Sequence, residues 1–153
     1  MQLPRPHHLA ALALSVFSLA ALAIQPVFQT EDGAIRGYDP VAYFTQHKPV
    51  KGDKQFTSKW QDAEWHFANE ANLKAFEANP EKYAPQYGGY CAYGVAQGYT
   101  PETDPAAFKV VNNKLYLNLS QAVLKKWSKD IKGYVKDADE NWPKLKDGSY
   151  KEK

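Results

Sequence analysis

The chain has 153 residues and a formal net charge of +2, with 44% hydrophobic and 24% charged residues. This length and balance indicate one soluble globular domain with a sizeable core, and they exclude a largely disordered or fibrous chain. The small net charge argues against nucleic acid or an anionic membrane as the main partner. A single cysteine excludes an intrachain disulfide and any multi-cysteine metal cluster.

The amino terminus has the pattern of a secretory signal peptide. An uncharged apolar run, 9–24, follows Arg5, and small residues stand at Ala21 and Ala23. Sixteen helical residues would span about 24 Å, which is short of the roughly 30 Å hydrocarbon core, so a retained membrane anchor is the weaker alternative. We therefore expect a signal peptide over residues 1–23 and a periplasmic or secreted protein without stable membrane insertion after cleavage.

The first half of the mature chain predicts an extended lead-in, a β-hairpin and a helix. Residues 24–36 lack periodicity, and residues 41–44 form either a strand or one helical turn. Aromatic and polar residues alternate over 55–67 on both sides of a short polar connection, which is typical of a β-hairpin. Asn69 is a good N-cap for a helix that Pro80 ends or bends.

The second half predicts another hairpin and a helical end. Two apolar strands flank Asn112 and Asn113, which tolerate the positive φ of a two-residue turn. Ser120 can cap a helix with a regular apolar stripe. We expect Gly133 to interrupt this helix and Pro143 to stop it.

These elements indicate a single α+β domain, in which helices pack on one side of short antiparallel hairpins, and not a parallel α/β sheet. We assign this domain to residues 24–143. The lysine-rich tail, 144–153, is expected to be flexible.

Several separated motifs resemble the YHS-domain family. Asp39-Pro40-Val41 resembles its opening, the segment 60–67 its hairpin, and Pro80-Glu81-Lys82-Tyr83 the end of its helix. The resemblance covers roughly residues 38–83. The remainder is similar to the extension of the small exported bacterial members of this family.

The resemblance implies capture of a soft metal by cysteines, but those cysteines are absent here. Ala42, Ala68 and Asn72 stand at the corresponding positions. Only His66 carries over, from a position where the family often has histidine. The family's metal site therefore does not transfer residue by residue.

Cys91 and His66 are the two residues of the mature chain best suited to bind a metal ion or to act as a nucleophile and its base. A thiolate and an imidazole suit copper or zinc, and the same pair could activate a nucleophile. The alternatives are a small buried hydrophobe at Cys91 and a locally hydrogen-bonded strand residue at His66. A metal site also needs further ligands, and the spacing selects none among Asp39, Glu64, His47 and the tyrosines.

The Tyr/Gly-rich segment, 84–100, holds four of the nine glycines. Its glycines suit either a ligand pocket floored by Tyr90 and Tyr93 or the close packing of a short helix. Exposed tyrosines would also suit a protein interface.

No phosphate-binding loop, zinc-protease motif or nucleophile elbow is present in the sequence. We expect an exported, non-enzymatic binding protein, and its first candidate role is copper-like metal binding or trafficking through Cys91 and His66. The alternative is a metal-free protein-interaction or small-ligand-binding module built around the loop 87–99. A Cys91-dependent enzyme is the third and weakest candidate.

Overall fold

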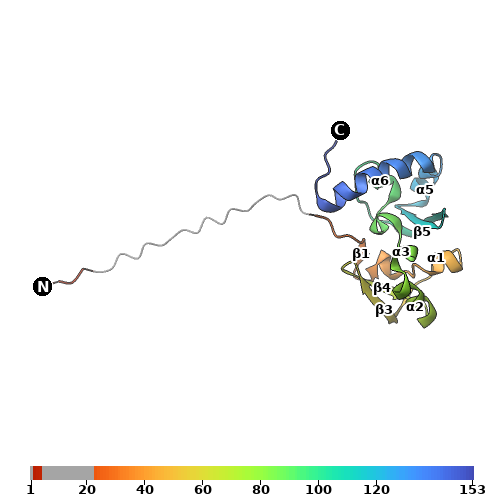
Figure 1. The fold of residues 1–153 in the computed structure, drawn as a ribbon, viewed down its shortest axis with the longest axis horizontal. Helices are drawn as coiled ribbons and strands as arrows, with labels where there is room; N and C mark the ends of the chain where they lie inside the picture. Colours follow the sequence, from red (N-terminus) through yellow and green to blue (C-terminus); the bar gives the residue numbers. More distant parts are fainter. Residues whose placement is uncertain (1, 5–22) are drawn as a thin grey trace.

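The computed structural model describes residues 2–4 and 23–153, so most of the predicted signal peptide lies outside the described residues. The described part contains three two-stranded antiparallel sheets and six α-helices, which confirms the predicted α+β class. Figure 1 shows the chain from residue 121 onward on one side of the domain and the hairpin of residues 53–67 on the other. No helix among these residues is both long and apolar enough to cross a membrane.

The lead-in, residues 24–36, is more structured than predicted. Strands β1 (Gln29–Thr30) and β2 (Gly33–Ala34) form a small hairpin, and the 3₁₀ helix η1 (Ile35–Gly37) comes next. Two residues per strand are too few to show a period in the sequence. Helix α1 (Ala42–Thr45) then takes the helical one of the two predicted options.

The hairpin predicted over 55–67 is confirmed. Strand β3 (Asp53–Trp60) pairs with β4 (Ala63–Phe67) through a two-residue turn with positive φ at both positions. Trp65 and Phe67 are fully buried, as expected for the apolar face of the hairpin. They contribute large rings to the core of this half of the domain.

A capped helix comes after this hairpin. The side chain of Asn69 accepts a hydrogen bond from the backbone N–H of Asn72 at 2.8 Å and so caps α2 (Glu70–Ala78). A second short helix, α3 (Pro80–Tyr83), begins at the proline. The predicted N-cap and the predicted helix end at Pro80 are both confirmed.

The Tyr/Gly-rich segment forms the 3₁₀ helix η2 (Gln86–Gly89) and the short helix α4 (Ala92–Ala96). A Cβ atom on Gly94 would collide with ring carbons of Pro101, so only glycine permits this approach. The close packing of a short helix, one of the two interpretations of these glycines, is therefore present.

The second hairpin contributes to two separate hydrophobic cores. Strand β5 (Asp104–Val111) pairs with β6 (Lys114–Asn118), and both residues of the predicted Asn-Asn turn have positive φ. Leu115 and Leu117 of β6 pack into the core of the first half, whereas Tyr116 packs into a second core with the C-terminal helices. Because side chains alternate along a strand, this strand serves both cores.

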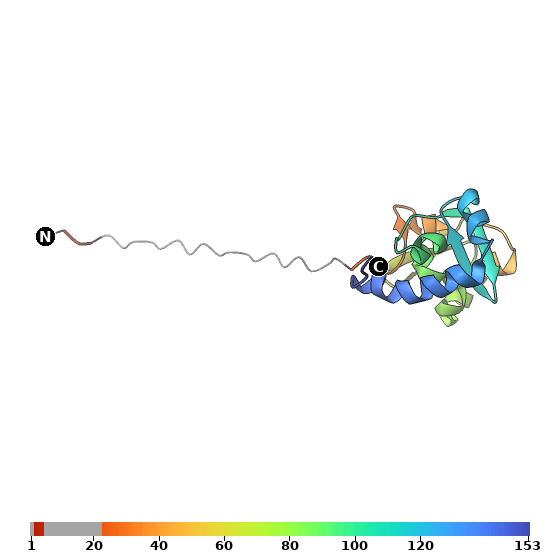
Figure 2. The same ribbon diagram turned by 90° about the horizontal axis from the view of Figure 1, so that it is seen from above.

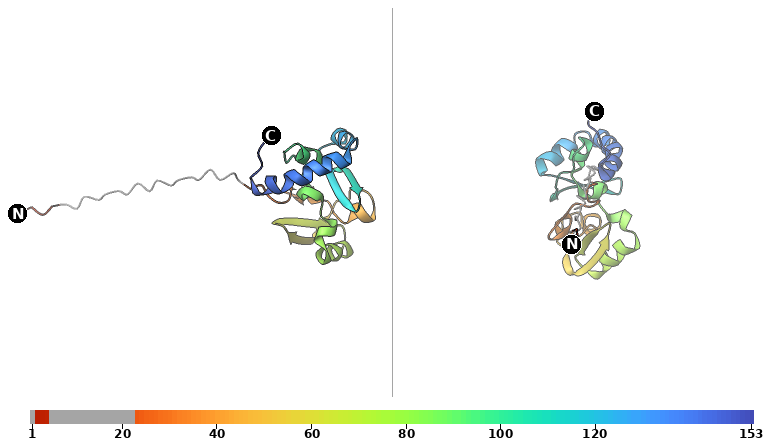
Figure 3. Two further views of the ribbon diagram at one scale, coloured as in Figure 1. Left: turned by 45° about the horizontal axis from the view of Figure 1, so that its top comes forward. Right: turned by 90° about the vertical axis from the view of Figure 1, so that its left-hand side faces the viewer.

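Helices α5 (Gln121–Trp127) and α6 (Ile131–Asp147) complete the domain. Ser120 caps α5 as predicted, since its hydroxyl accepts from the N–H of Val123 at 3.2 Å. The two halves are seen one above the other in the right-hand view of Figure 3. In Figure 2, α6 runs along one edge of the domain, and its C-terminal end lies beside the start of the lead-in.

Two predictions about these helices were wrong. The break falls before Ile131, where the carboxylate of Asp130 accepts from the N–H of Gly133 at 3.1 Å and begins a new helix. Gly133 therefore belongs to the first turn of α6 and does not interrupt it. Pro143 lies inside α6 and does not stop it, because Trp142 and Leu145 on either side pack into the second core.

Candidate functional site

His66 lies in a tight pocket beneath the lead-in. Its side chain is buried, and its Nε2 atom lies 3.2 Å from Oε1 of Glu64. A Cβ atom on Gly33 would come within 3.1 Å of the same nitrogen, and one on Gly37 within 3.3 Å of Nδ1. His66 thus points away from the face of Trp65, as the alternation implies, and the lead-in covers it.

Cys91 is buried at the start of α4, with 1% of its surface exposed. Its sulfur accepts hydrogen bonds from the N–H of Gly94 at 3.5 Å and of Leu119 at 3.3 Å, and its S–H faces Oδ1 of Asn118 at 3.6 Å. Burial raises the pKa of the thiol, although the backbone N–H groups partly oppose this effect. The neutral thiol is therefore the favoured form.

The structure does not join Cys91 and His66 by a hydrogen bond, and their hydrogen-bonding partners have no residue in common. Within residues 2–4 and 23–153, no three His, Cys, Asp or Glu side chains come together as a metal-binding group. Their assignment as metal ligands stays a prediction.

The positions where the resemblance implies thiolates surround a buried carboxylate, that of Asp39. Its Oδ1 accepts from the N–H groups of Val41 at 2.8 Å and Ala42 at 3.3 Å. Its Oδ2 accepts from the N–H of Ala68 and from the side-chain amide of Asn72, both at 2.8 Å. A carboxylate has about four lone-pair sites, so these four donors leave none for a metal. The residues at this place do not fit a soft metal ion.

An open-sided cavity of about 430 Å³ lies between the two halves of the domain. Its lining includes Trp60 at the end of β3, Tyr87 and Gly88 of η2, and Trp142 of α6. These walls come from three segments far apart in the sequence. No spacing rule brings them together, so neither tryptophan was among the residues predicted for a site.

Tyr90 and Tyr93, which one of the two interpretations places on the floor of a ligand pocket, are not among the residues that line this cavity. The hydroxyl of Tyr90 donates to the backbone carbonyl of Gln25 at 2.9 Å, and its ring packs against Trp142. Tyr93 packs against Tyr134, with 5.1 Å between the ring centroids. These contacts support the packing interpretation of the segment, since both rings pack against aromatic side chains of α6.

Tyr87 connects η2 to α6 beside the cavity. Its hydroxyl donates to Oδ1 of Asp139 at 2.9 Å. The pKa of Tyr87 is raised well above its ordinary value. Burial is the larger cause, and this hydrogen bond is the second. Tyr87 therefore stays protonated and keeps donating to the carboxylate.

The lead-in forms one wall of the cavity because Gly88 lets it pass closely. A Cβ atom on Gly88, which has a φ of 63°, would collide with the carbonyl oxygen of Pro26. The N–H of Phe28 donates to the carbonyl of Gly88 at 2.9 Å. Glycine at this position is thus a requirement of the wall.

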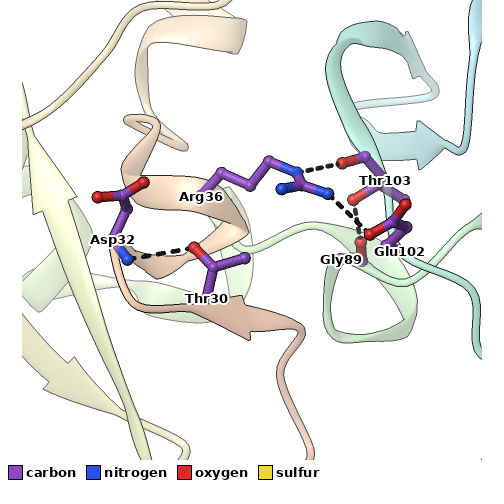
Figure 4. Close-up of polar contacts among 6 residues, drawn as sticks. All are labelled: Thr30, Asp32, Arg36, Gly89, Glu102 and Thr103. Atoms are coloured by element: carbon purple, nitrogen blue, oxygen red, sulfur yellow. Dashed lines mark hydrogen bonds and ion pairs between the residues drawn. The ribbon is translucent and has the colours of Figure 1, made fainter.

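Arg36 ties the same lead-in to the second half of the domain (Figure 4). Its Nε donates to the carbonyl of Thr103 at 2.9 Å, and its guanidinium pairs with Glu102 at 3.0 Å. The hydroxyl of Thr103 donates in turn to the carbonyl of Gly89 at 2.7 Å. This chain of bonds holds η1 against the end of η2, which contributes to the lining of the cavity.

The comparisons with known proteins agree with the motifs noted in the sequence. The family model of the YHS domain matches residues 41–87, so the resemblance is confirmed and the chain carries a YHS domain over these residues. YHS domains are associated in general with metal binding, including copper. No curated protein and no solved structure matches the chain significantly.

Proposed function

We propose that this chain is an exported, non-enzymatic binding protein that holds a small organic ligand between its YHS domain and helix α6. The cavity of about 430 Å³ carries this proposal. Small-molecule sites are typically concave, roughly 300–1,000 Å³ in volume, and lined by aromatic side chains with a few polar groups. The loop-based alternative drawn from the sequence is thereby favoured, with Tyr87 and Gly88 as its contributing residues.

The way the cavity walls are fixed supports a site that is formed before the ligand arrives. The hydrogen bond between Tyr87 and Asp139 joins η2 to α6, and that between Phe28 and Gly88 joins the lead-in to η2. A wall held by such bonds loses little conformational entropy on binding.

A non-enzymatic role is supported by the state of Cys91. A catalytic thiol needs access and a lowered pKa, whereas this thiol is buried and its pKa is raised. Alkylation of Cys91 at neutral pH as fast as a free thiol would contradict the proposal.

Export is supported by the apolar run before Ala23. Mass spectrometry of the protein recovered from the cell envelope or medium tests it. The expected amino terminus follows Ala23, and an intact chain retained in the cytoplasm would contradict export.

The binding proposal is tested by a fragment screen on the mature protein, followed by the indole N–H resonances of its four tryptophans. We expect bound fragments to shift the resonances of Trp60 and Trp142, with Trp127, fully buried in the second core, as the internal control. A screen without hits, or hits that leave both cavity tryptophans unshifted, would refute the proposal.

Transition-metal binding through Cys91 and His66 is the second candidate, and the YHS match is the observation that favours it. Binding would require the sulfur to exchange its hydrogen bonds from Gly94 and Leu119 for a metal. Titration with Cu(I) and with Zn(II) under reducing conditions tests this candidate. Binding that is lost in both Cys91→Ala and His66→Ala would support it, and equal binding by all three proteins would reject it.

A further inference from the structure

We propose that the cavity recognises a small organic cation, such as a quaternary ammonium group or an alkylated amine. This inference rests on the proposed function and names its ligand class. It is drawn from the charges at the cavity, from its aromatic walls and from the contacts of Lys146.

The charged side chains at the cavity favour a positive ligand. Glu81 of α3 and Asp139 of α6 are carboxylates that line the cavity from different helices, and Lys146 is the one cation among the described residues of the lining. All three are exposed, so they reach the rim without being desolvated. The other polar lining side chains in this described set, apart from Tyr87, are the neutral amides Gln61 and Gln86. An anion would thus meet two carboxylates, whereas a cation would meet one ammonium group.

Lys146 does not neutralise either carboxylate. Among the described residues, no ion pair within 4.0 Å joins Lys146 to Glu81 or Asp139. Asp139 accepts from Tyr87 through Oδ1, and no protein donor within the described chain reaches its Oδ2. One carboxylate oxygen therefore remains for a ligand that donates or carries positive charge.

The contact made by Lys146 shows how such a ligand would bind. Its Nζ lies over the ring of Trp142, 5.9 Å from the ring centroid. A cation over the face of an indole is attracted by the ring quadrupole, and tryptophan is the best of the aromatic residues for this interaction. The chain itself thus places an ammonium group on one wall, and a ligand cation could take the corresponding position.

The apolar lining indicates a cation that carries carbon. Trp60 and Trp142 both line the cavity and are only partly buried, so each leaves apolar ring surface that a ligand can cover. A bare metal ion gains nothing from such surface, whereas methyl or alkyl groups on nitrogen are favourably buried there. Alkylated ammonium ions combine both properties.

The test compares choline with 3,3-dimethyl-1-butanol, which has the same shape without the charge. Both are titrated into the mature protein at low salt, with tryptophan fluorescence and calorimetry as readouts. We expect choline to bind roughly tenfold more tightly, a difference of about 1.4 kcal/mol. Because the charged groups are exposed, a high concentration of NaCl should reduce this ratio.

Variants identify the site. Glu81→Gln combined with Asp139→Asn should bring the ratio close to one, since both replacements keep the shape and the new amide oxygen at position 139 can still accept from Tyr87. The matched control is Glu77→Gln combined with Asp137→Asn, which removes two exposed carboxylates that do not line the cavity. This control should retain the full preference for choline.

The outcomes separate the two proposals. Equal binding of choline and its neutral isostere, or tighter binding of ethanesulfonate, would overturn the cation inference and leave the ligand pocket intact. Failure of these probes together with a fragment screen that shifts neither Trp60 nor Trp142 would overturn the proposed function itself. A loss of preference in the matched control would place the cation elsewhere and also overturn the inference.

Discussion

The side-chain amide of Asn72 donates to the buried carboxylate of Asp39 at 2.8 Å, across 33 positions of sequence. The same carboxylate receives three backbone N–H groups, two from the start of α1 and one from the loop before α2. Asp39 thereby joins the start of α1, the residue that follows β4 and the first turn of α2. At the positions where the resemblance implies thiolates, this chain has a structural centre made of nitrogen donors and one carboxylate.

Removal of that carboxylate should be severely destabilising. Asp39→Ala leaves four donors without an acceptor, two of them in fully buried surroundings, so we expect a loss of roughly 3–5 kcal/mol in the free energy of unfolding. Urea unfolding followed by tryptophan fluorescence measures it. Glu77→Ala, an exposed carboxylate, is the control and should lose less than about 0.5 kcal/mol. A loss in Asp39→Ala no larger than that of the control would show that the centre is dispensable.

The buried thiol predicts an alkaline dependence of stability. The pKa of Cys91 is raised above its ordinary value of 9.0 in the folded state, so the unfolded chain ionises first as the pH rises. The resulting contribution to stability is fully present below pH 9.0 and is lost as the pH rises through the folded-state pKa.

Unfolding free energies of the wild type and Cys91→Ala, each measured at neutral pH and at a pH of about 10, isolate this contribution. The wild type should lose more stability between the two values than the variant does, because the tyrosines titrate in both proteins. An equal loss in the two proteins would contradict the raised pKa.

The bond between Tyr87 and Asp139 should be measurable as a coupling. In a double-mutant cycle with Tyr87→Phe and Asp139→Ala, we expect a coupling free energy of about 1 kcal/mol, because the hydrogen bond is only partly buried. Tyr87→Phe should also loosen η2 against α6 and weaken any fragment bound in the cavity. Additive effects of the two substitutions would mean that the bond does not hold the wall.

Gly88→Ala should displace the lead-in. The added methyl meets the carbonyl of Pro26, and the positive φ of 63° is itself unfavourable for alanine by about 1 kcal/mol. We expect a loss of roughly 1–3 kcal/mol in the free energy of unfolding and faster proteolysis between residues 24 and 30. Unchanged proteolysis of this segment, together with an unchanged free energy of unfolding, would argue that the lead-in can move aside freely.

Local patterns predicted the elements well. The hairpin through Asn112 and Asn113 and the helix caps at Asn69 and Ser120 depend on residues within a few positions of each other. The rule that a proline ends a helix failed at Pro143, because Trp142 and Leu145 beside it pack into the second core. Most residues of that core lie far from Pro143 in the sequence, so a local pattern could not reveal this packing.

The candidate site was less predictable, since its walls meet only through tertiary structure. Trp60 and Trp142 are separated by most of the folded chain, and nothing in their local sequence pairs them. The sequence allows Cys91 to be either a buried hydrophobe or a ligand, but its partners Asn118 and Leu119 depend on how the end of β6 packs against α4. Residue types alone do not tell whether Cys91 and His66 lie close enough in space to share a metal ion.

The double-sided strand β6 makes the YHS-matched segment dependent on the C-terminal part of the chain. Residues 41–87 supply most of the first core, yet Leu115 and Leu117 come from outside the match and are almost completely enclosed there. If residues 41–87 were expressed alone, the first core would lose two leucines, and the aromatic side chains of that core would become more exposed to solvent. A shortened chain that folds on its own must therefore extend at least through Asn118, and the C-terminal extension is part of the architecture of this protein.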